Sequence, residues 1–279
     1  MLIELAIGDA YGAGFEYAPE DFIRRHNRAT HFVQHPRHSI RPGRYTDDTQ
    51  MSLAIAEALV SGDRWTPAML AGRFVAAFRR DPREGYARGF HAFLSETEDG
   101  EEFLAQIRPD SDKSGAAMRA APIGVLPTIG QVVDRAQVQA RLTHDTPDGT
   151  NAAIAAALMS HYFLYDLGPK AELGAFLASR VPGAWAAPWS GKVGPKGWMS
   201  VRAAITAVTR NDSLEGLLID CVGFTGDVDT VATIALAAAS CSRDYAPDLP
   251  ENLLAMLEDG PYGRPYLAEL DARLLALRG

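Results

Sequence analysis

The sequence predicts an all-α protein, because apolar residues recur at helical spacing along the chain while strand patterns are nearly absent. Short alternating runs of Val, Ile, Thr and Tyr joined by Asn-Gly or Asp-Gly turns, which are typical of β-hairpins, hardly occur. Alanine-rich stretches near 150–164 and 230–240 indicate central helices that pack closely, since small side chains let neighbouring axes approach. We therefore expect one compact all-α domain over residues 1–279, with no linker dividing it.

Five amphipathic stripes predict the main helices in chain order. The first covers 51–59 and ends at Ser61-Gly62, and the second covers 70–78 after Pro67. The other three stripes cover 154–165, 201–208 and 267–277. Between the stripes, we expect long irregular loops over about 19–44, 82–115 and 181–198, and we expect them to surround a site.

Composition and charge exclude several classes of protein. Lys and Arg number 27 against 35 Asp and Glu, so the net charge of −8 excludes a protein that coats nucleic acid or anionic membrane nonspecifically. Cys221 and Cys241 form no disulfide framework, so we expect a reducing, cytoplasmic location. No run of about 18 uncharged apolar residues and no secretion signal occurs, so we expect no membrane partner.

Two acidic segments, each at the expected start of a helix, are the strongest candidates for a site. They are Thr46-Asp47-Asp48-Thr49 and Asp227-Val228-Asp229-Thr230. Helix capping explains one such segment, with Thr46 or Asp47 accepting hydrogen bonds and Gln50 completing a capping box. However, adjacent carboxylates repel unless a proton or cation intervenes, and the two segments lie 180 residues apart. Together they offer hard oxygens that suit Mg²⁺, Mn²⁺ or Ca²⁺, and four carboxylates favour a pair of ions.

Three further segments each have a functional and a structural interpretation. The segment from Gly8 to Glu16 lacks the spacing and the preceding strand of a dinucleotide site, so its glycines indicate close helix packing or a tight turn. The segment from Ser114 to Gly124 places small residues at a helix start, where backbone N–H groups bind phosphate, although packing also accounts for them. His144 precedes another helix and either contacts a substrate or caps that helix.

A basic segment follows the first glycine-rich segment. No acidic residue occurs from Phe22 to Thr46, whereas six arginines do. We weigh a solvated basic loop equally against a patch that attracts a diphosphate or a nucleic acid. His31, His35 and His38 also lie in this segment, but Pro36 prevents their alignment on a helix and no cysteine joins them, so we favour a solvated loop over a zinc site.

Read in chain order, these segments resemble the ADP-ribosylglycohydrolase family, whose members remove ADP-ribose from arginine or serine. The resemblance rests on five stretches that span nearly the whole chain: Gly8-Asp9 to Glu16, Tyr45 to Met51, Ser114 to Gly124, Thr143-His144, and Gly226 to Thr230. It implies a compact all-α fold with a central cleft that binds two Mg²⁺ or Mn²⁺ ions. One departure is that the family motif Gly-Gly-Asp-Thr-Asp-Thr reads Thr225-Gly226-Asp227-Val228-Asp229-Thr230 here.

The resemblance also implies roles for individual residues. The implied metal ligands are Thr46, Asp47, Asp48, Asp227, Asp229 and Thr230. The implied catalytic residues are Glu16, Asp47 and Asp229. The implied substrate-binding residues are Ser114, Gly115, Ala116, Ala117 and Met118, which cradle a diphosphate and ribose, together with His144.

The implied activity is metal-dependent hydrolysis of the N- or O-glycosidic bond between ADP-ribose and a modified target. Water activated by the metal attacks the anomeric carbon, and the expected substrate is ADP-ribosyl-arginine. Alternatives are ADP-ribosylated nucleic acid or serine as substrate, a noncatalytic ADP-ribose-binding relative, and a metal-dependent phosphohydrolase that releases phosphate or AMP. We expect a monomer that takes an ADP-ribosylated protein or nucleic acid as substrate and releases ADP-ribose.

Overall fold

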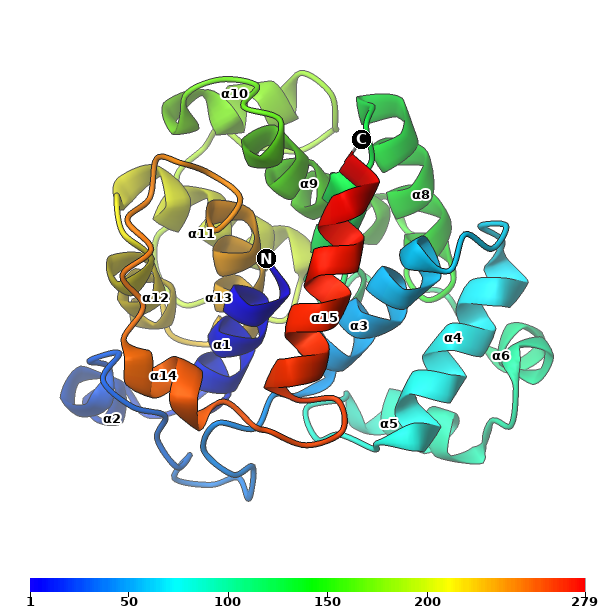
Figure 1. Ribbon diagram of the computed structural model, residues 1–279, viewed down its shortest axis with the longest axis horizontal. Coiled ribbons are helices and arrows are strands. Elements are labelled where there is room, and N and C mark those ends of the chain that lie inside the picture. The colour runs from blue at the N-terminus through cyan, green and yellow to red at the C-terminus, as the bar shows by residue number, and fades with distance from the viewer. Residues whose placement is uncertain (279) are drawn as a thin grey trace.

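Two helices that lie far apart in the sequence pack together at the centre of the molecule. The structure is a computed structural model that describes residues 1–278. Helix α1 (Leu2–Ala13) lies along α13 (Val228–Ala239), and every residue of α13 is buried (Figure 1). The glycines of α1 make this approach possible. A Cβ at Gly8 would lie 2.6 Å from the carbonyl oxygen of Ala232, and one at Gly12 would lie 2.3 Å from the Cα of Asp229. Close helix packing is therefore confirmed as the role of these two glycines.

The all-α prediction is confirmed. Among residues 1–278 the only β-type pairings are isolated bridges, such as Val193 with Gly226. The remaining α-helices are α2 (Glu20–His26), α3 (Asp47–Val60), α4 (Pro67–Arg80), α5 (Arg88–Glu96), α6 (Gly100–Gln106), α7 (Gly115–Met118), α8 (Ile129–Arg141), α9 (Pro147–Leu164), α10 (Leu173–Ala178), α11 (Gly197–Arg210), α12 (Leu214–Gly223), α14 (Glu251–Met256) and α15 (Arg264–Leu275). Short 3-10 turns are η1 (Ala121–Val125), η2 (Lys170–Glu172) and η3 (Ala276–Arg278).

Two of the three predicted loops contain helices, so the prediction of long irregular segments was partly wrong. Helix α2 lies within 19–44, and α5 and α6 lie within 82–115. Each is nine residues or shorter, and α5 and α6 bury few side chains, such as Leu94 and Phe103, so their apolar period is too brief to recognise. The last stripe also ends early, because α15 stops at Leu275 and Leu277 is exposed.

The remaining helices surround the central pair and share one apolar cluster with it. Helices α3, α9 and α11 all contact α13, and α15 lies across α1 and α3 (Figure 1). The alanine-rich α9 is buried on all sides from Ala152 to Leu164, which confirms that it is a central helix. No helix within residues 1–278 combines the length and the apolar character that crossing a membrane requires.

The close approach of α1 to α13 predicts opposite effects for two Gly-to-Ala substitutions. Gly8→Ala forces a methyl group against the backbone of α13 and should lower the free energy of unfolding by about 1–3 kcal/mol. Gly72→Ala lies in α4 with open space around the added methyl, and should raise it by up to about 1 kcal/mol. Urea unfolding of both variants measures the difference. Equal stability of the two variants would contradict the packing argument.

Candidate functional site

A cavity of about 520 Å³ opens between the first turns of α3 and α13. Acidic residues line one end, and they are Glu16, Asp47, Asp48, Asp227 and Asp229, with Thr230 beside them. Apolar side chains of Phe90, Phe93 and Ile107 are also part of the lining. The cavity thus brings together both predicted acidic segments and the Glu16 segment, although they are distant in the sequence.

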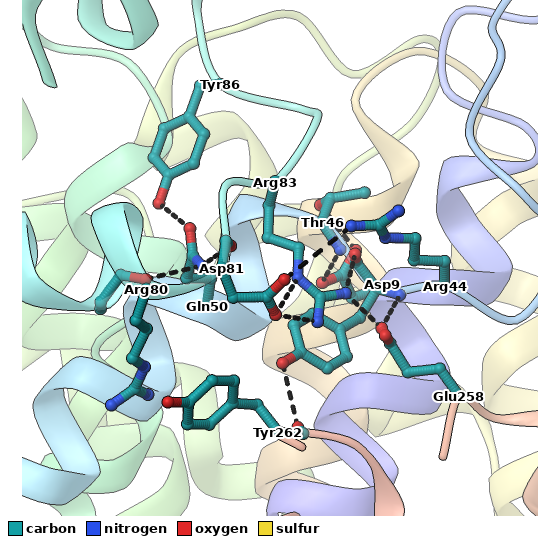
Figure 2. A network of polar contacts seen from close by, with 12 residues as sticks. Asp9, Arg44, Thr46, Gln50, Arg80, Asp81, Arg83, Tyr86, Glu258 and Tyr262 are labelled. Carbon is teal, nitrogen blue, oxygen red and sulfur yellow. Dashed lines mark hydrogen bonds and ion pairs between the residues drawn. The ribbon is translucent and has the colours of Figure 1, made fainter. Parts of the chain in front are cut away.

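The start of α3 is capped from another helix rather than by its own residues. The buried Asp9 carboxylate on α1 accepts hydrogen bonds from the backbone N–H and hydroxyl of Thr46, at 2.9 and 2.7 Å (Figure 2). It accepts two more from the N–H and hydroxyl of Thr49, at 2.9 and 2.6 Å. The predicted capping by Thr46 or Asp47 with Gln50 was therefore wrong, since Gln50 bonds to Ala77 instead. Because Asp9 satisfies these groups, Asp47 and Asp48 are left to line the cavity.

An ion-pair network around the buried Arg83 holds the residue before Thr46. Arg83 is paired with Asp81 and Glu258, and its guanidinium lies 3.8 Å from the centre of the Tyr45 ring (Figure 2). Glu258 also accepts a hydrogen bond from the Tyr45 N–H at 3.0 Å, and the Tyr45 hydroxyl donates to the carbonyl of Tyr262. The segment after α14 and the loop after α4 therefore fix the residue that precedes α3, in addition to the cap from Asp9.

The second acidic segment is held by a loop pairing with Val193. The Val193 N–H donates to the carbonyl of Thr225, and the Asp227 N–H donates to the carbonyl of Val193. Gly226 has φ +91°, and a Cβ there would lie 1.9 Å from the Val193 oxygen, so only glycine fits. Thr225, which replaces the first Gly of the family motif, has φ +64°, a conformation that is rare for a β-branched residue.

The acidic end of the cavity is electrostatically unfavourable without a counter-ion. Burial, and then repulsion from neighbouring acids, raises the pKa of Asp47, Asp48 and Asp229 well above the ordinary range. Burial raises the pKa of Glu16 to about 7, with further contributions from Asp227 and Asp9. Burial also raises the pKa of Asp227, against hydrogen bonds that lower it.

The acidic residues fit a hard cation. Oxygens of Glu16, Asp227 and Asp229, one from each, lie within 4.8 Å of one another. In addition, Oδ2 of Asp48 and Oδ1 of Asp229 are buried with no hydrogen-bond partner. Buried carboxylate oxygens without donors are costly, and a divalent cation that prefers oxygen ligands would satisfy them. The Thr46 hydroxyl, in contrast, donates to Asp9, and Thr46 is outside the cavity lining.

Part of the predicted substrate-binding segment lines the same cavity. Ser114, Gly115 and Met118 are lining residues, whereas Ala116 and Ala117 are buried behind them. The helix expected to begin at this segment is the four-residue α7, followed by a 3-10 turn.

His144 lines the cavity as a neutral side chain. Arg119 donates to the Thr143 hydroxyl at 2.8 Å, and the same hydroxyl forms a hydrogen bond of 2.6 Å with Nδ1 of His144. Burial and the charge of Arg119 lower the pKa of His144 to about 3, and the ring packs near Gly115.

Sequence reasoning gave no role to several residues that build this site. Arg119 is fully buried, burial lowers its pKa to about 9, and it holds Thr143 and Gln139. Arg119 and Asp9 both lie inside segments that the sequence singled out, but only their buried hydrogen bonds reveal what they do. Arg83 and Glu258 carry no sequence signal, because each is an ordinary charged residue in an irregular segment.

The comparisons with known proteins agree with this architecture. The family whose sequence pattern matches residues 1–279 is described as ADP-ribosylglycohydrolase. The chain is 28% identical to ADP-ribosyl-[dinitrogen reductase] glycohydrolase of Rhodospirillum rubrum over 99% of this chain and 94% of that protein. It is 32% identical to ADP-ribosylhydrolase ARH3 of Xenopus tropicalis over 48% and 41% of the two chains. It is 25% identical to ADP-ribosylarginine hydrolase Tri1 of Serratia proteamaculans over 53% and 42%.

A solved structure, an ADP-ribosylglycohydrolase-related protein complex, shares the fold. Its TM-score is 0.73 at 24% identity, and the match covers 99% of this chain and 95% of that one. The likeness therefore extends over almost all of the architecture described above.

The buried acids predict how stability depends on pH and divalent cations. The folded pKa of Glu16, about 7, lies above its ordinary value of 4.5, and the other cavity acids shift in the same direction. Without a cation, their contribution to stability is complete below their ordinary pKa values and is lost as pH rises through the folded ones. Chelated protein should therefore melt at a lower temperature at about pH 8 than at about pH 5.

Added Mg²⁺ or Mn²⁺ should raise the melting temperature more at about pH 8 than at about pH 5, because the ion replaces protons on the carboxylates. Differential scanning calorimetry with and without chelator measures both effects. A cation effect that is the same at both pH values would contradict the assignment of the cavity acids as the binding site.

Proposed function

The chain belongs to the ADP-ribosylglycohydrolase family of enzymes, and we propose that it hydrolyses the bond between ADP-ribose and a modified arginine side chain. The observation that carries the proposal is the cluster of buried carboxylates at one end of the 520 Å³ cavity. The arginine linkage is supported by the relative from Serratia proteamaculans, which is named as an ADP-ribosylarginine hydrolase. We also propose that residues 1–279 act as one domain and as a cytoplasmic monomer, with ADP-ribose as the product.

We propose that two Mg²⁺ or Mn²⁺ ions are held by Thr46, Asp47, Asp48, Asp227, Asp229 and Thr230. The two partnerless oxygens of Asp48 and Asp229 support this set. Thr46 donates its only hydroxyl proton to Asp9, which leaves its oxygen lone pairs for a cation. When bound, such ions supply Lewis-acid polarisation of substrate oxygens and lower the pKa of a coordinated water.

In this mechanism the carboxylates of the chain move the proton and stabilise charge. Glu16 has a pKa of about 7, which suits a group that takes a proton from the attacking water near neutral pH. Bond cleavage at the anomeric carbon builds positive charge on the sugar. The carboxylates of Asp47 and Asp229, at the acidic end of the cavity, stabilise that charge.

The rest of the substrate is bound next to the acids. We propose that the backbone around Ser114, Gly115, Ala116, Ala117 and Met118 binds the diphosphate and distal ribose, since three of these residues line the cavity. The His144 ring is neutral and would form a hydrogen bond with the substrate without adding charge beside the acids.

An ADP-ribosylated nucleic acid is a second candidate substrate, favoured by two cations that contact the cavity-lining residue Tyr17. Arg37 donates to the carbonyl of Tyr17, a lining residue, and the Nζ of Lys192 lies 5.1 Å from the centre of its ring. Positive charge beside the cavity lining favours a target that carries phosphates. Serine-linked ADP-ribose is the remaining alternative target.

Loss of one cavity acid should abolish hydrolysis while loss of a surface acid should not. Asp229→Asn removes a charge that the transition state requires, and we expect kcat to fall about 100-fold or more. Asp134→Asn changes an exposed Asp on α8 in the same way and should leave kcat unchanged. The measurement is product analysis with arginine-, serine- and nucleotide-linked ADP-ribose at added Mg²⁺.

Intact ADP-ribose released fastest from the arginine substrate supports the main proposal, and faster release from modified oligonucleotide supports the second candidate. Release of phosphate or AMP would show a phosphohydrolase instead. Full activity of Asp229→Asn, or of wild-type protein in chelator, would contradict the mechanism.

A further inference from the structure

His35 is a buried histidine in the basic segment from Phe22 to Thr46, where the three histidines are expected in a solvated loop rather than a zinc site. Only 3% of its surface is exposed, and its ring stacks on that of His38 with the two ring centres 4.2 Å apart. The expectation of a solvated loop is therefore wrong for His35. A buried imidazole needs partners for both nitrogens, and those partners indicate what the residue does.

The two nitrogens of His35 have different partners. Nδ1 accepts hydrogen bonds from the backbone N–H groups of Arg37 and His38, both at 3.0 Å. A nitrogen that accepts carries no hydrogen, so the hydrogen is on Nε2. Nε2 donates to the backbone carbonyl of Glu16 at 2.9 Å. His35 thus connects its own turn to the turn that carries Glu16.

The turn that contains Glu16 and Tyr17 is held by hydrogen bonds from other segments of the chain. It follows the end of α1, and Tyr17 has φ +49°, which few residues other than glycine adopt. The Tyr17 N–H donates to the carbonyl of Gly226 at 2.8 Å, and Arg37 donates to the carbonyl of Tyr17. His35 and Arg37 therefore bind the carbonyls of Glu16 and Tyr17. The N–H of Tyr17 is bound by Gly226, which directly precedes the second acidic segment.

Among residues 1–278, no hydrogen bond or ion pair holds the Glu16 carboxylate in the cavity. The groups that act on its carboxyl are Asp227 and Asp9, which repel it. Its position is therefore set by its backbone rather than by partners of the carboxylate.

We propose that His35 is a positioning residue: its imidazole fixes the Glu16 backbone and thereby aims the Glu16 carboxylate at the acidic end of the cavity. This inference rests on the proposed function, in which Glu16 takes the proton of the attacking water. It also gives a role to a segment that the sequence left unexplained. A carboxylate that moves by about 1 Å loses up to about 100-fold in rate, so the bond from His35 affects turnover rather than binding.

Two variants separate the two nitrogens of His35. In His35→Asn the amide oxygen stands where Nδ1 was, so the local turn with Arg37 and His38 is kept while the bond to Glu16 is lost. In His35→Gln the amide nitrogen stands where Nε2 was, so the bond to Glu16 is kept and the local turn loses its acceptor. His38→Gln changes the exposed neighbour and serves as control.

The experiment measures kcat and KM of the three variants together with hydrogen exchange of a peptide covering 14–18 in the absence of substrate. We expect His35→Asn to lower kcat about 10- to 100-fold with little change in KM, and to speed exchange in that peptide. His35→Gln should keep most of kcat and exchange at close to the wild-type rate. His38→Gln should match wild-type protein in both measurements.

Two results would overturn the proposal. One is wild-type exchange and kcat in His35→Asn. The other is a loss of kcat and a faster exchange in His35→Gln that equal or exceed those in His35→Asn, which would mean that the bond from Nε2 to Glu16 is not what His35 contributes. If wild-type protein hydrolyses no ADP-ribosyl substrate, the proposed function fails, and the exchange comparison still decides whether His35 holds the Glu16 turn.

Discussion

The constraint on which this structure depends is the gathering of five carboxylates, four of them buried and that of Glu16 half-buried, around one end of a single cavity. Burial opposes their ionisation and raises the pKa of all five carboxyl groups, and repulsion from neighbouring acids adds to it for Glu16, Asp47, Asp48 and Asp229. Such a cluster is stable only if protons or cations neutralise it. The fold must therefore hold each of these residues through its backbone against the repulsion between the carboxylates. The hydrogen bonds and ion pairs around the cavity do so.

The residues that hold the carboxylates in place lie far apart in the sequence. Asp9 on α1 caps α3, and the ion pair of Arg83 with Glu258 holds Tyr45, the residue before Thr46. Gly12 lets α1 approach α13 at Asp229 itself, so helix packing and site geometry are set by the same contact. The acids are therefore placed by the most buried helices of the molecule, whose stability offsets the cost of gathering like charges.

Sequence reasoning predicted the parts of this arrangement that have a local signature. Paired acids before the apolar stripes of α3 and α13, and small residues in α1, are visible in the sequence because each is a short run of unusual composition. The capping of α3 by Asp9 and the bond from His35 to Glu16 are not visible, since each joins segments whose contact only the fold creates. Helices α2, α5 and α6 were missed because they are too short for their periods to register.

The central claim is that a divalent cation replaces protons on these carboxylates, and proton release on metal binding tests it most directly. Calorimetric titration of Mn²⁺ into metal-free protein near pH 6.5, in two buffers of different ionisation enthalpy, counts the protons released. Net release is expected, because Glu16, whose pKa is about 7, is partly protonated at that pH, and Glu16→Gln should release fewer protons. Binding without proton release, or no binding, would contradict it.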